Sequence, residues 1–167
     1  DIDRFVGLGP AKPSDTTNNP DWVFYDAWWN TILANDTDKA CMYTNRFVFT
    51  NTSNGLTFEQ IQGPAWIPGT YAEVIGVNPD QCYDESIATT MFGTKNIYFF
   101  PSTSHAAING SYDEVPYRQT SFKISDGGFM GWFVGDVEYD VIDASEESLF
   151  VRFIQPGSEF AWYAKYK

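Results

Sequence analysis

The hydrophobic pattern is clearest in the last fifty residues, where short apolar and aromatic runs alternate with tight polar turns. Runs of this length, rich in β-branched and aromatic residues, are typical of strands. They predict five strands, over Thr120–Ser125, Phe129–Val134, Val137–Asp143, Leu149–Gln155 and Phe160–Tyr166. Consecutive strands joined by tight turns indicate an antiparallel meander.

The middle of the chain carries weaker patterns of the same kind. Met42–Thr50 and Leu56–Gln62 flank the turn cluster Asn51–Gly55, which predicts a hairpin. Two further strands are predicted over Thr70–Gly76 and Asn96–Phe100. The segments predicted as loops or irregular backbone are Lys12–Pro20, Asp36–Lys39, Gly63–Gly69, Asn78–Glu85 and Pro101–Pro116.

Helical patterns are scarce, and only Asp21–Leu33 could hold a short helix. The chain is therefore predicted to be all-β, with about ten strands, as a single carbohydrate-binding domain over residues 1–167. An antiparallel, jelly-roll-like β-sandwich is the expected architecture. A lipocalin-like β-barrel is the alternative, because both architectures bury one face of each strand and leave the other in water.

Composition narrows the class of partner. Aromatic residues make up 18% of the chain, which indicates a folded domain, because disordered chains lack such apolar surface. The formal net charge is −12 and the sequence pI is about 4.2. This charge repels phosphate backbones and anionic membrane surfaces, so nucleic acid is excluded as the expected partner. A neutral glycan meets no such repulsion.

Segments that would anchor the chain are not evident in its sequence. No run approaches the roughly 18 apolar residues that cross a bilayer, so no membrane insertion by this domain is predicted. The chain begins at Asp1 without a signal-like run, and we expect it to be part of a longer multidomain protein. Cys41 and Cys82 could form one bridge or remain two buried thiols.

Tryptophans in loop-like contexts are the main candidates for ligand contact. Exposed aromatic side chains in loops mark binding surfaces, and a flat indole matches the apolar face of a sugar ring. Such a contact contributes about 1–3 kcal/mol per ring. The predicted ligand-binding residues are Trp22, Trp28, Trp29 and Trp66, with Asp26 and Tyr71. Trp132 and Trp162 lie inside predicted strands and are assigned to the core.

Catalytic and metal chemistry have little support in the sequence. Glu138–Asp143 nearly matches the E-x-D-x-x-E of laminarinase-type hydrolases, but Asp occupies the final position. A retaining hydrolase needs its two carboxyl groups about 5–5.5 Å apart, and a shorter side chain disrupts that spacing. His105 is the single histidine, so no enzyme is predicted. Oxygen atoms in Asn35–Asp38 could hold a structural calcium, and no other cofactor is predicted.

Several segments resemble a domain found in secreted Bacteroidota proteins. The closing stretch is the most specific: Gly127–Gly135 resembles "GGFIGYYTG", Tyr139–Ile142 resembles "YEIL", Glu147–Arg152 resembles "ENELYLRY" and Ala161–Tyr163 resembles "AWY". Earlier in the chain, Phe5–Pro10 resembles the family's "GHxGVGP" opening, and Pro20–Trp22 together with Trp28–Trp29 resembles its Pro-x-Trp-Trp segment. Lys39 matches a Lys of the family, Met42–Phe49 resembles its "YDDxFTF" strand, and Asn54–Gly55 matches its "NG" turn. The chain departs from the family at Arg4, where the family has His, in a split Pro-x-Trp-Trp unit, and at Asn45 and Arg46, which replace an acidic pair.

The family resemblance implies a function and a location. The domain usually follows polycystic-kidney-disease-type Ig-like repeats, in surface glycan-binding lipoproteins and as an appendage of laminarinases. This implies a carbohydrate-binding module of a polysaccharide-utilisation system, often for β-1,3-glucan such as laminarin. The expected location is extracellular or at the outer-membrane surface, and the expected partner is a neutral polysaccharide or oligosaccharide.

Two other classes of function remain open at this point. The acidic surface and the aromatic residues could form a protein interface, which makes the chain a scaffold domain of an outer-membrane glycan-uptake complex. A closed barrel could instead hold one small apolar ligand. A glycan-binding module predicts outward-facing indole rings, whereas the barrel predicts an enclosed apolar cavity.

Overall fold

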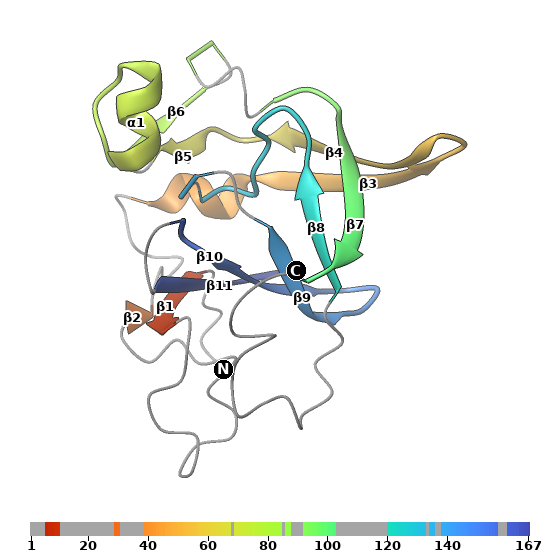
Figure 1. The fold of residues 1–167 in the computed structure, drawn as a ribbon. Helices are drawn as coiled ribbons and strands as arrows, with labels where there is room; N and C mark the ends of the chain where they lie inside the picture. Colours follow the sequence, from red (N-terminus) through yellow and green to blue (C-terminus); the bar gives the residue numbers. More distant parts are fainter. Residues whose placement is uncertain are drawn as a thin grey trace. The chain divides into compact units, whose positions relative to one another are not determined.

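The computed structural model describes residues 6–10, 29–30, 39–67, 69–84, 86–87, 92–102, 120–132, 134–135, 138–156 and 160–167. These residues belong to two compact units, each of which combines segments from distant parts of the chain (Figure 1). Unit 1 takes its residues from Asp1–Leu33, Phe99–Phe122 and Val137–Lys167. Unit 2 takes its residues from Ala34–Tyr98 and Lys123–Asp136.

Unit 1 is an antiparallel sheet in which the neighbours follow the order β2-β1-β11-β10-β9-β8. Its strands are β1 (Val6–Pro10), β2 (Trp29–Asn30), β8 (Thr120–Ile124), β9 (Tyr139–Ala144), β10 (Leu149–Ile154) and β11 (Phe160–Tyr166). Strand β8 belongs to this unit as far as Phe122. The strands that are adjacent in the sequence from β9 to β11 are also adjacent in the sheet, as expected for a meander.

Alternation along these strands produces two rows of side chains on opposite faces of the sheet. On one face, Phe122, Tyr139, Phe153 and Trp162 are direct cross-strand neighbours from β8 to β11. The rings of Phe122 and Tyr139 stack with their centroids 5.1 Å apart, and Tyr139 lies 5.1 Å from Phe153. Aromatic pairs at this separation add to the stabilisation from burial. Phe122, Tyr139 and Phe153 are buried.

The opposite face of the same sheet is also buried. Ser121, Asp140, Arg152 and Tyr163 are cross-strand neighbours there, and all four are buried. Ile142, Phe150 and Ile154 pack with Ala161 and Tyr163 on this face. Unit 1 therefore buries both faces of its sheet from β8 to β11.

Unit 2 contains a three-stranded antiparallel sheet, a two-stranded sheet and one short helix. The larger sheet has the order β7-β4-β3, and β5 pairs with β6 in the smaller one. The elements are η2 (Ala40–Thr44), β3 (Arg46–Thr52), β4 (Gly55–Gln62), β5 (Ala65–Ile67), α1 (Gly69–Ile75), β6 (Gln81–Tyr83) and β7 (Lys95–Pro101), the last as far as Tyr98. Ala65, Ile67, Ala72 and Phe129 form one buried cluster.

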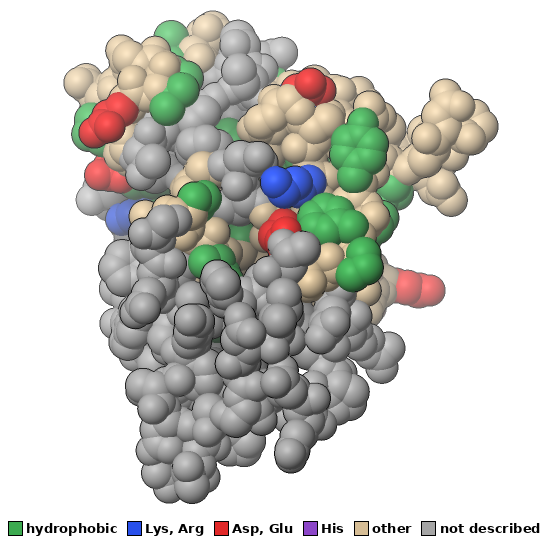
Figure 2. Space-filling view, viewed as in Figure 1, with side chains coloured by type: hydrophobic (Ala, Val, Ile, Leu, Met, Phe, Trp, Pro, Cys, Tyr) green, Lys and Arg blue, Asp and Glu red, His purple; other side chains and the backbone are tan. Residues whose placement is uncertain are grey.

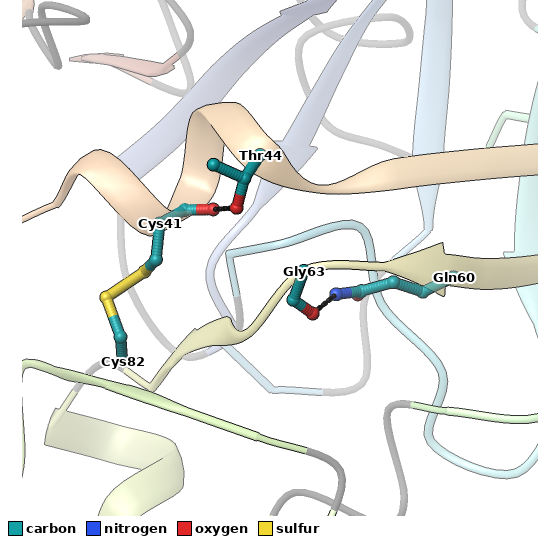
Figure 3. Close-up of a disulfide and its surroundings, with 5 residues drawn as sticks. All are labelled: Cys41, Thr44, Gln60, Gly63 and Cys82. Carbon is teal, nitrogen blue, oxygen red and sulfur yellow. Dashed lines mark hydrogen bonds between the residues drawn. A yellow bond between two sulfur atoms is a disulfide. The ribbon is translucent and has the colours of Figure 1, made fainter.

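A disulfide joins Cys41 in η2 to Cys82 in β6, across a sequence separation of 41 (Figure 3). Thr44 Oγ1 donates to the carbonyl oxygen of Cys41 at 2.8 Å, and Gln60 Nε2 donates to that of Gly63 at 3.3 Å. The bridge settles the alternative left open by the sequence, since both cysteines are bonded. It ties the start of the β3–β4 hairpin to the small β5–β6 sheet.

The predicted all-β, antiparallel class is confirmed. The predicted hairpin appears as β3 and β4, and β7 to β11 follow the predicted strands closely, with Phe160–Tyr166 unchanged. Two predictions stay predictions: the choice between a sandwich and a barrel, and the single domain over residues 1–167.

The predicted strand Thr70–Gly76 is wrong, because this segment forms helix α1. Ala72 and Ile75 lie one helical turn apart and both pack on the buried cluster of unit 2, so helical spacing suits their burial. The helix ends at Gly76, which adopts a left-handed φ of +74°. The amides of Gly76 and Val77 both donate to the carbonyl of Ala72, an arrangement that closes helix ends.

Four other segments also differ from prediction. Gly63–Gly69 contains β5, and Asn78–Glu85 contains β6, because each short strand is formed by pairing with the other. Residues Ala40–Thr44 form a 3-10 turn rather than the start of a strand. No described residue of Phe129–Val134 is in a strand, although Phe129, Met130 and Trp132 are buried. Gly131, with a φ of +76°, interrupts the extended backbone there.

Candidate functional site

Trp66 is a core residue, and its prediction as an exposed side chain in a loop is wrong. It is the middle residue of β5 and only 2% exposed. Its cross-strand neighbour is Cys82 of the disulfide, and Lys39 Nζ lies 5.2 Å from the centre of its ring. The prolines that suggested an exposed loop flank β5 in the sequence, and the tryptophan between them lies in a strand paired with β6.

The remaining predicted ligand residues fall where their side chains are not described. Trp22, Asp26 and Trp28 lie outside the described residues. For Trp29 in β2 and Tyr71 in α1 the structure describes the backbone alone. Their roles in ligand binding stay predictions.

Trp132 and Trp162, predicted as core residues in strands, each match part of that prediction. Trp132 is buried, as predicted for a core residue, although the backbone there is irregular. Trp162 is partly buried in β11, and its Nε1 donates to Gln155 Oε1 at 3.3 Å. Neither side chain forms an open platform.

The acidic segment Glu138–Asp143 lies in β9 from Tyr139 onward, and its Asp140 is buried in unit 1. Arg152 Nε donates to Asp140 Oδ2 at 3.0 Å, and Nη2 of the same arginine contacts this oxygen. Ser102 and Ser121 both donate to Asp140 Oδ1, at 2.5 and 2.6 Å. Asp140 and Arg152 are fully buried, so their charges are neutralised by each other and by hydrogen bonds.

Unit 2 exposes one face of its larger sheet. We call it the open face, and it consists of Val48, Thr50, Thr57, Glu59, Asn96 and Tyr98. Thr50 lies opposite Thr57, and Thr57 lies opposite Asn96, so these three residues form a polar row across β3, β4 and β7. Tyr98 follows two residues along β7 and therefore lies on the same face.

Asn96 has its backbone groups engaged and its side chain available. Its amide donates to Ser125 Oγ at 3.0 Å, and its carbonyl accepts from the Ser125 amide at 2.9 Å. Because these groups point away from β4, Asn96 and Thr57 form a non-hydrogen-bonded pair, which brings side chains close. Within the described part of the chain, the side-chain amide of Asn96 and the hydroxyl of Tyr98 have no hydrogen-bond partner.

Tyr98 and Phe99 are adjacent residues with nearly equal exposure, 57% and 56%. They point to opposite faces of β7, because successive side chains alternate along a strand. The ring of Phe99 lies 5.9 Å from that of the buried Phe122. In the view of Figure 2, exposed hydrophobic side chains gather over β7. Tyr98 differs from Phe99 in having polar neighbours on its face and a hydroxyl of its own.

The part of the open face that lies on β7 was predicted as a strand, yet Tyr98 was not predicted as a site residue. Asn96–Phe100 is dominated by apolar letters, which indicate burial. The available signal was the alternation of Asn96 and Tyr98 with Lys95 and Ile97. Lys95 and Ile97 are buried, whereas Asn96 and Tyr98 are exposed.

The part of the chain that the structure describes contains neither a cluster of metal-ligating side chains nor a membrane-spanning helix. Its histidine, cysteine, aspartate and glutamate side chains nowhere gather in groups of three or more. None of its helices has the length and apolar character needed to cross a membrane. No protein-family model matches the chain, and no curated protein matches it.

Proposed function

We propose that this chain is a non-catalytic carbohydrate-binding module for a neutral polysaccharide. The observation that carries the proposal is the open face of unit 2. It presents an exposed tyrosine beside neutral hydroxyl and amide groups. Such a surface offers both kinds of contact that a sugar chain requires, an apolar plate for ring C–H groups and polar groups for hydroxyls.

Each contact contributes only a modest binding free energy, which suits reversible binding to a long polymer. Placing a sugar ring on an aromatic side chain removes apolar area from water and contributes about 1–3 kcal/mol. A direct hydrogen bond to a hydroxyl adds about 0.5–1.5 kcal/mol net. A few such contacts produce an affinity in the micromolar-to-millimolar range.

Charge supports a neutral ligand rather than an anionic one. The chain has a net charge of −12. The charged residue of the open face is Glu59, which is also an anion. A polysaccharide of uronic acids would be repelled by both, whereas a glucan would not.

A β-glucan such as laminarin is the ligand that we propose first, on the strength of the family resemblance. The same resemblance supports a place in a polysaccharide-utilisation system of a Bacteroidota cell. The disulfide between Cys41 and Cys82 supports an extracellular or outer-membrane-surface location, because disulfides persist in oxidising compartments. We further propose that the module belongs to a longer multidomain protein.

Affinity electrophoresis tests the proposed function directly. The unmodified protein would be run through native gels that contain laminarin, mixed-linkage glucan, mannan or alginate. We expect retardation by at least one neutral glycan and none by alginate, with a non-binding protein of similar size as control. Migration that is unchanged in every neutral gel would refute the proposal. If the protein instead bound a glycan-uptake protein whether or not oligosaccharide was added, the scaffold function would replace it.

A further inference from the structure

Exposed aromatic side chains on the strands of the described residues differ in what surrounds them. Phe49, Tyr98 and Phe99 are the three, at 39%, 57% and 56% exposure. Phe49 packs edge-on against the buried Phe58 with ring centres 5.6 Å apart, and Phe99 packs against Phe122. Each of these phenylalanines packs one side of its ring on a buried core residue. We therefore attribute their partial exposure to a position at the edge of the core.

Tyr98 has no such role in the described structure. In that part of the chain, its ring stacks on no other ring and its hydroxyl has no hydrogen-bond partner. A large aromatic residue that is more than half exposed loses the stabilisation that burial would provide. Its position beside the polar row suggests that its partner is a ligand.

We infer that the polysaccharide of the proposed function binds on the open face of unit 2, with Tyr98 as the stacking platform and Asn96 as a hydrogen-bonding residue beside it. This inference rests on the proposed function and replaces the predicted role of Trp66. Thr50 and Thr57 extend the polar surface from Asn96 across β4 to β3.

The dimensions of the open face indicate the length of the ligand. Neighbouring strands lie about 4.8 Å apart, so the row from Thr50 to Asn96 spans roughly 10 Å. Tyr98 is two residues along the strand from Asn96, a further distance of about 7 Å. This surface is larger than one hexose ring. The ligand is therefore an internal stretch of an extended chain, and a free monosaccharide should compete poorly.

Hydrogen-bonding capacity on the open face also has a definite pattern. Thr57 Oγ1 donates to the carbonyl of Thr50 at 3.3 Å, which leaves the threonine oxygen as an acceptor. The Asn96 side chain offers two donors and one acceptor oxygen, and the Tyr98 hydroxyl can do either. Sugar hydroxyls likewise donate and accept, so this mixture suits them better than it suits an anion.

The decisive experiment compares neighbouring variants on the glycan that retards the unmodified protein. Tyr98→Ala should weaken binding by about tenfold or more, since it removes the ring contact. Asn96→Ala should weaken binding by about threefold to tenfold, since it removes one side-chain hydrogen bond. Phe99→Ala is the matched control, with the same exposure on the opposite face of β7, and its affinity should stay within about twofold.

Isothermal titration calorimetry with an oligosaccharide would measure these affinities, and thermal unfolding would confirm that each variant is folded. Tyr98→Phe keeps the ring and provides a second test if Tyr98→Ala does not fold; it should retain most of the affinity. Glucose as a competitor should displace the oligosaccharide only at concentrations far above those of a short glucan.

The outcomes separate this inference from the proposed function. If no neutral glycan binds the unmodified protein, the proposed function fails and the inference fails with it. If a glycan binds but folded Tyr98→Ala binds as tightly as the unmodified protein, the open face is not the site, although the function stands. A larger loss from Phe99→Ala than from Tyr98→Ala would likewise overturn the assignment.

Discussion

The two units use polar residues on antiparallel strands in opposite ways. In unit 1, Ser121, Asp140 and Arg152 lie in register across β8, β9 and β10; all three are buried, and the serine and the arginine both donate hydrogen bonds to Asp140. In unit 2, Thr50 and Asn96 belong to a similar register row but face water.

This contrast distinguishes a structural polar row from a binding surface. Asp140 accepts hydrogen bonds from an arginine and two serines, so no capacity remains for a ligand. Asn96 and Tyr98 retain their side-chain hydrogen-bonding capacity within the described structure. Polar residues on a strand do not by themselves identify a binding site. The candidate site is identified by available hydrogen-bonding groups next to an exposed ring.

The largest effect should come from breaking the buried ion pair of unit 1. Arg152→Met leaves the Asp140 carboxylate without its cation and should lower the free energy of unfolding by about 3–5 kcal/mol. Urea denaturation measures this change. Adding Asp140→Asn should recover part of the loss, because the double variant has no buried charge. Lys165→Ala, on an exposed position of β11, is the control and should change stability by less than about 0.5 kcal/mol.

Removing the disulfide should have the next largest effect and should act on unit 2. The bridge closes a loop with a sequence separation of 41. The Cys41→Ser, Cys82→Ser double variant should lose about 2–4 kcal/mol of stability, because the unfolded chain regains freedom. The unmodified protein in reductant should approach the same urea midpoint. Equal midpoints with and without the bridge would show that the unit is held by its core alone.

Gly128→Ala tests the packing beneath the β3–β4–β7 sheet. A Cβ at this position would overlap the side chains of Ile124 and Lys95, both of which are buried. Overpacking of this kind costs about 1–3 kcal/mol. Gly69→Ala is the matched control, since its Cβ would meet only Pro79 at an ordinary 3.8 Å, and it should not reduce stability. A tolerated Gly128→Ala would mean that this packing can relax.

The smallest effect concerns alkaline pH and unit 1. Burial raises the pKa of the Tyr166 phenol well above its usual value, and the nearby Tyr139 raises it further. The stabilising contribution of Tyr166 is therefore complete below the unfolded-state pKa of about 10 and is lost as pH rises toward the folded-state value. Above about pH 10, the free energy of unfolding should fall with pH less steeply for Tyr166→Phe than for the unmodified protein. The two slopes should differ by up to about 1.4 kcal/mol per pH unit. Parallel slopes would show that the phenol ionises equally in both states.

Much of the fold could be predicted from local pattern alone. β11 was predicted with its observed bounds, because apolar and aromatic residues alternate there, and β10 was predicted to within one residue from a nearly continuous apolar run between clear turn signals. The hairpin of β3 and β4 was predicted for the same reason, with Asn54–Gly55 at its turn. Local pattern was sufficient for these strands, each of which pairs with a neighbour in sequence.

Prediction failed where burial depended on distant partners. Trp66 was expected in an exposed loop, but it lies in β5, pairs with Cys82 of β6 and is buried. Thr70–Gly76 was expected as a strand, but a helix brings Ala72 and Ile75 onto one cluster with Phe129. In both cases, residues far along the chain decide which side chains are buried.

The sequence by itself determined the all-β class, the acidic charge and the position of most strands, because these depend on composition and short-range alternation. Only the tertiary structure decided that Cys41 bonds to Cys82, that Asp140 is paired in a core, and that Tyr98 stands beside a polar row. The physical reason is that exposure and hydrogen-bond partners are set by contacts between strands, which adjacent residues do not encode.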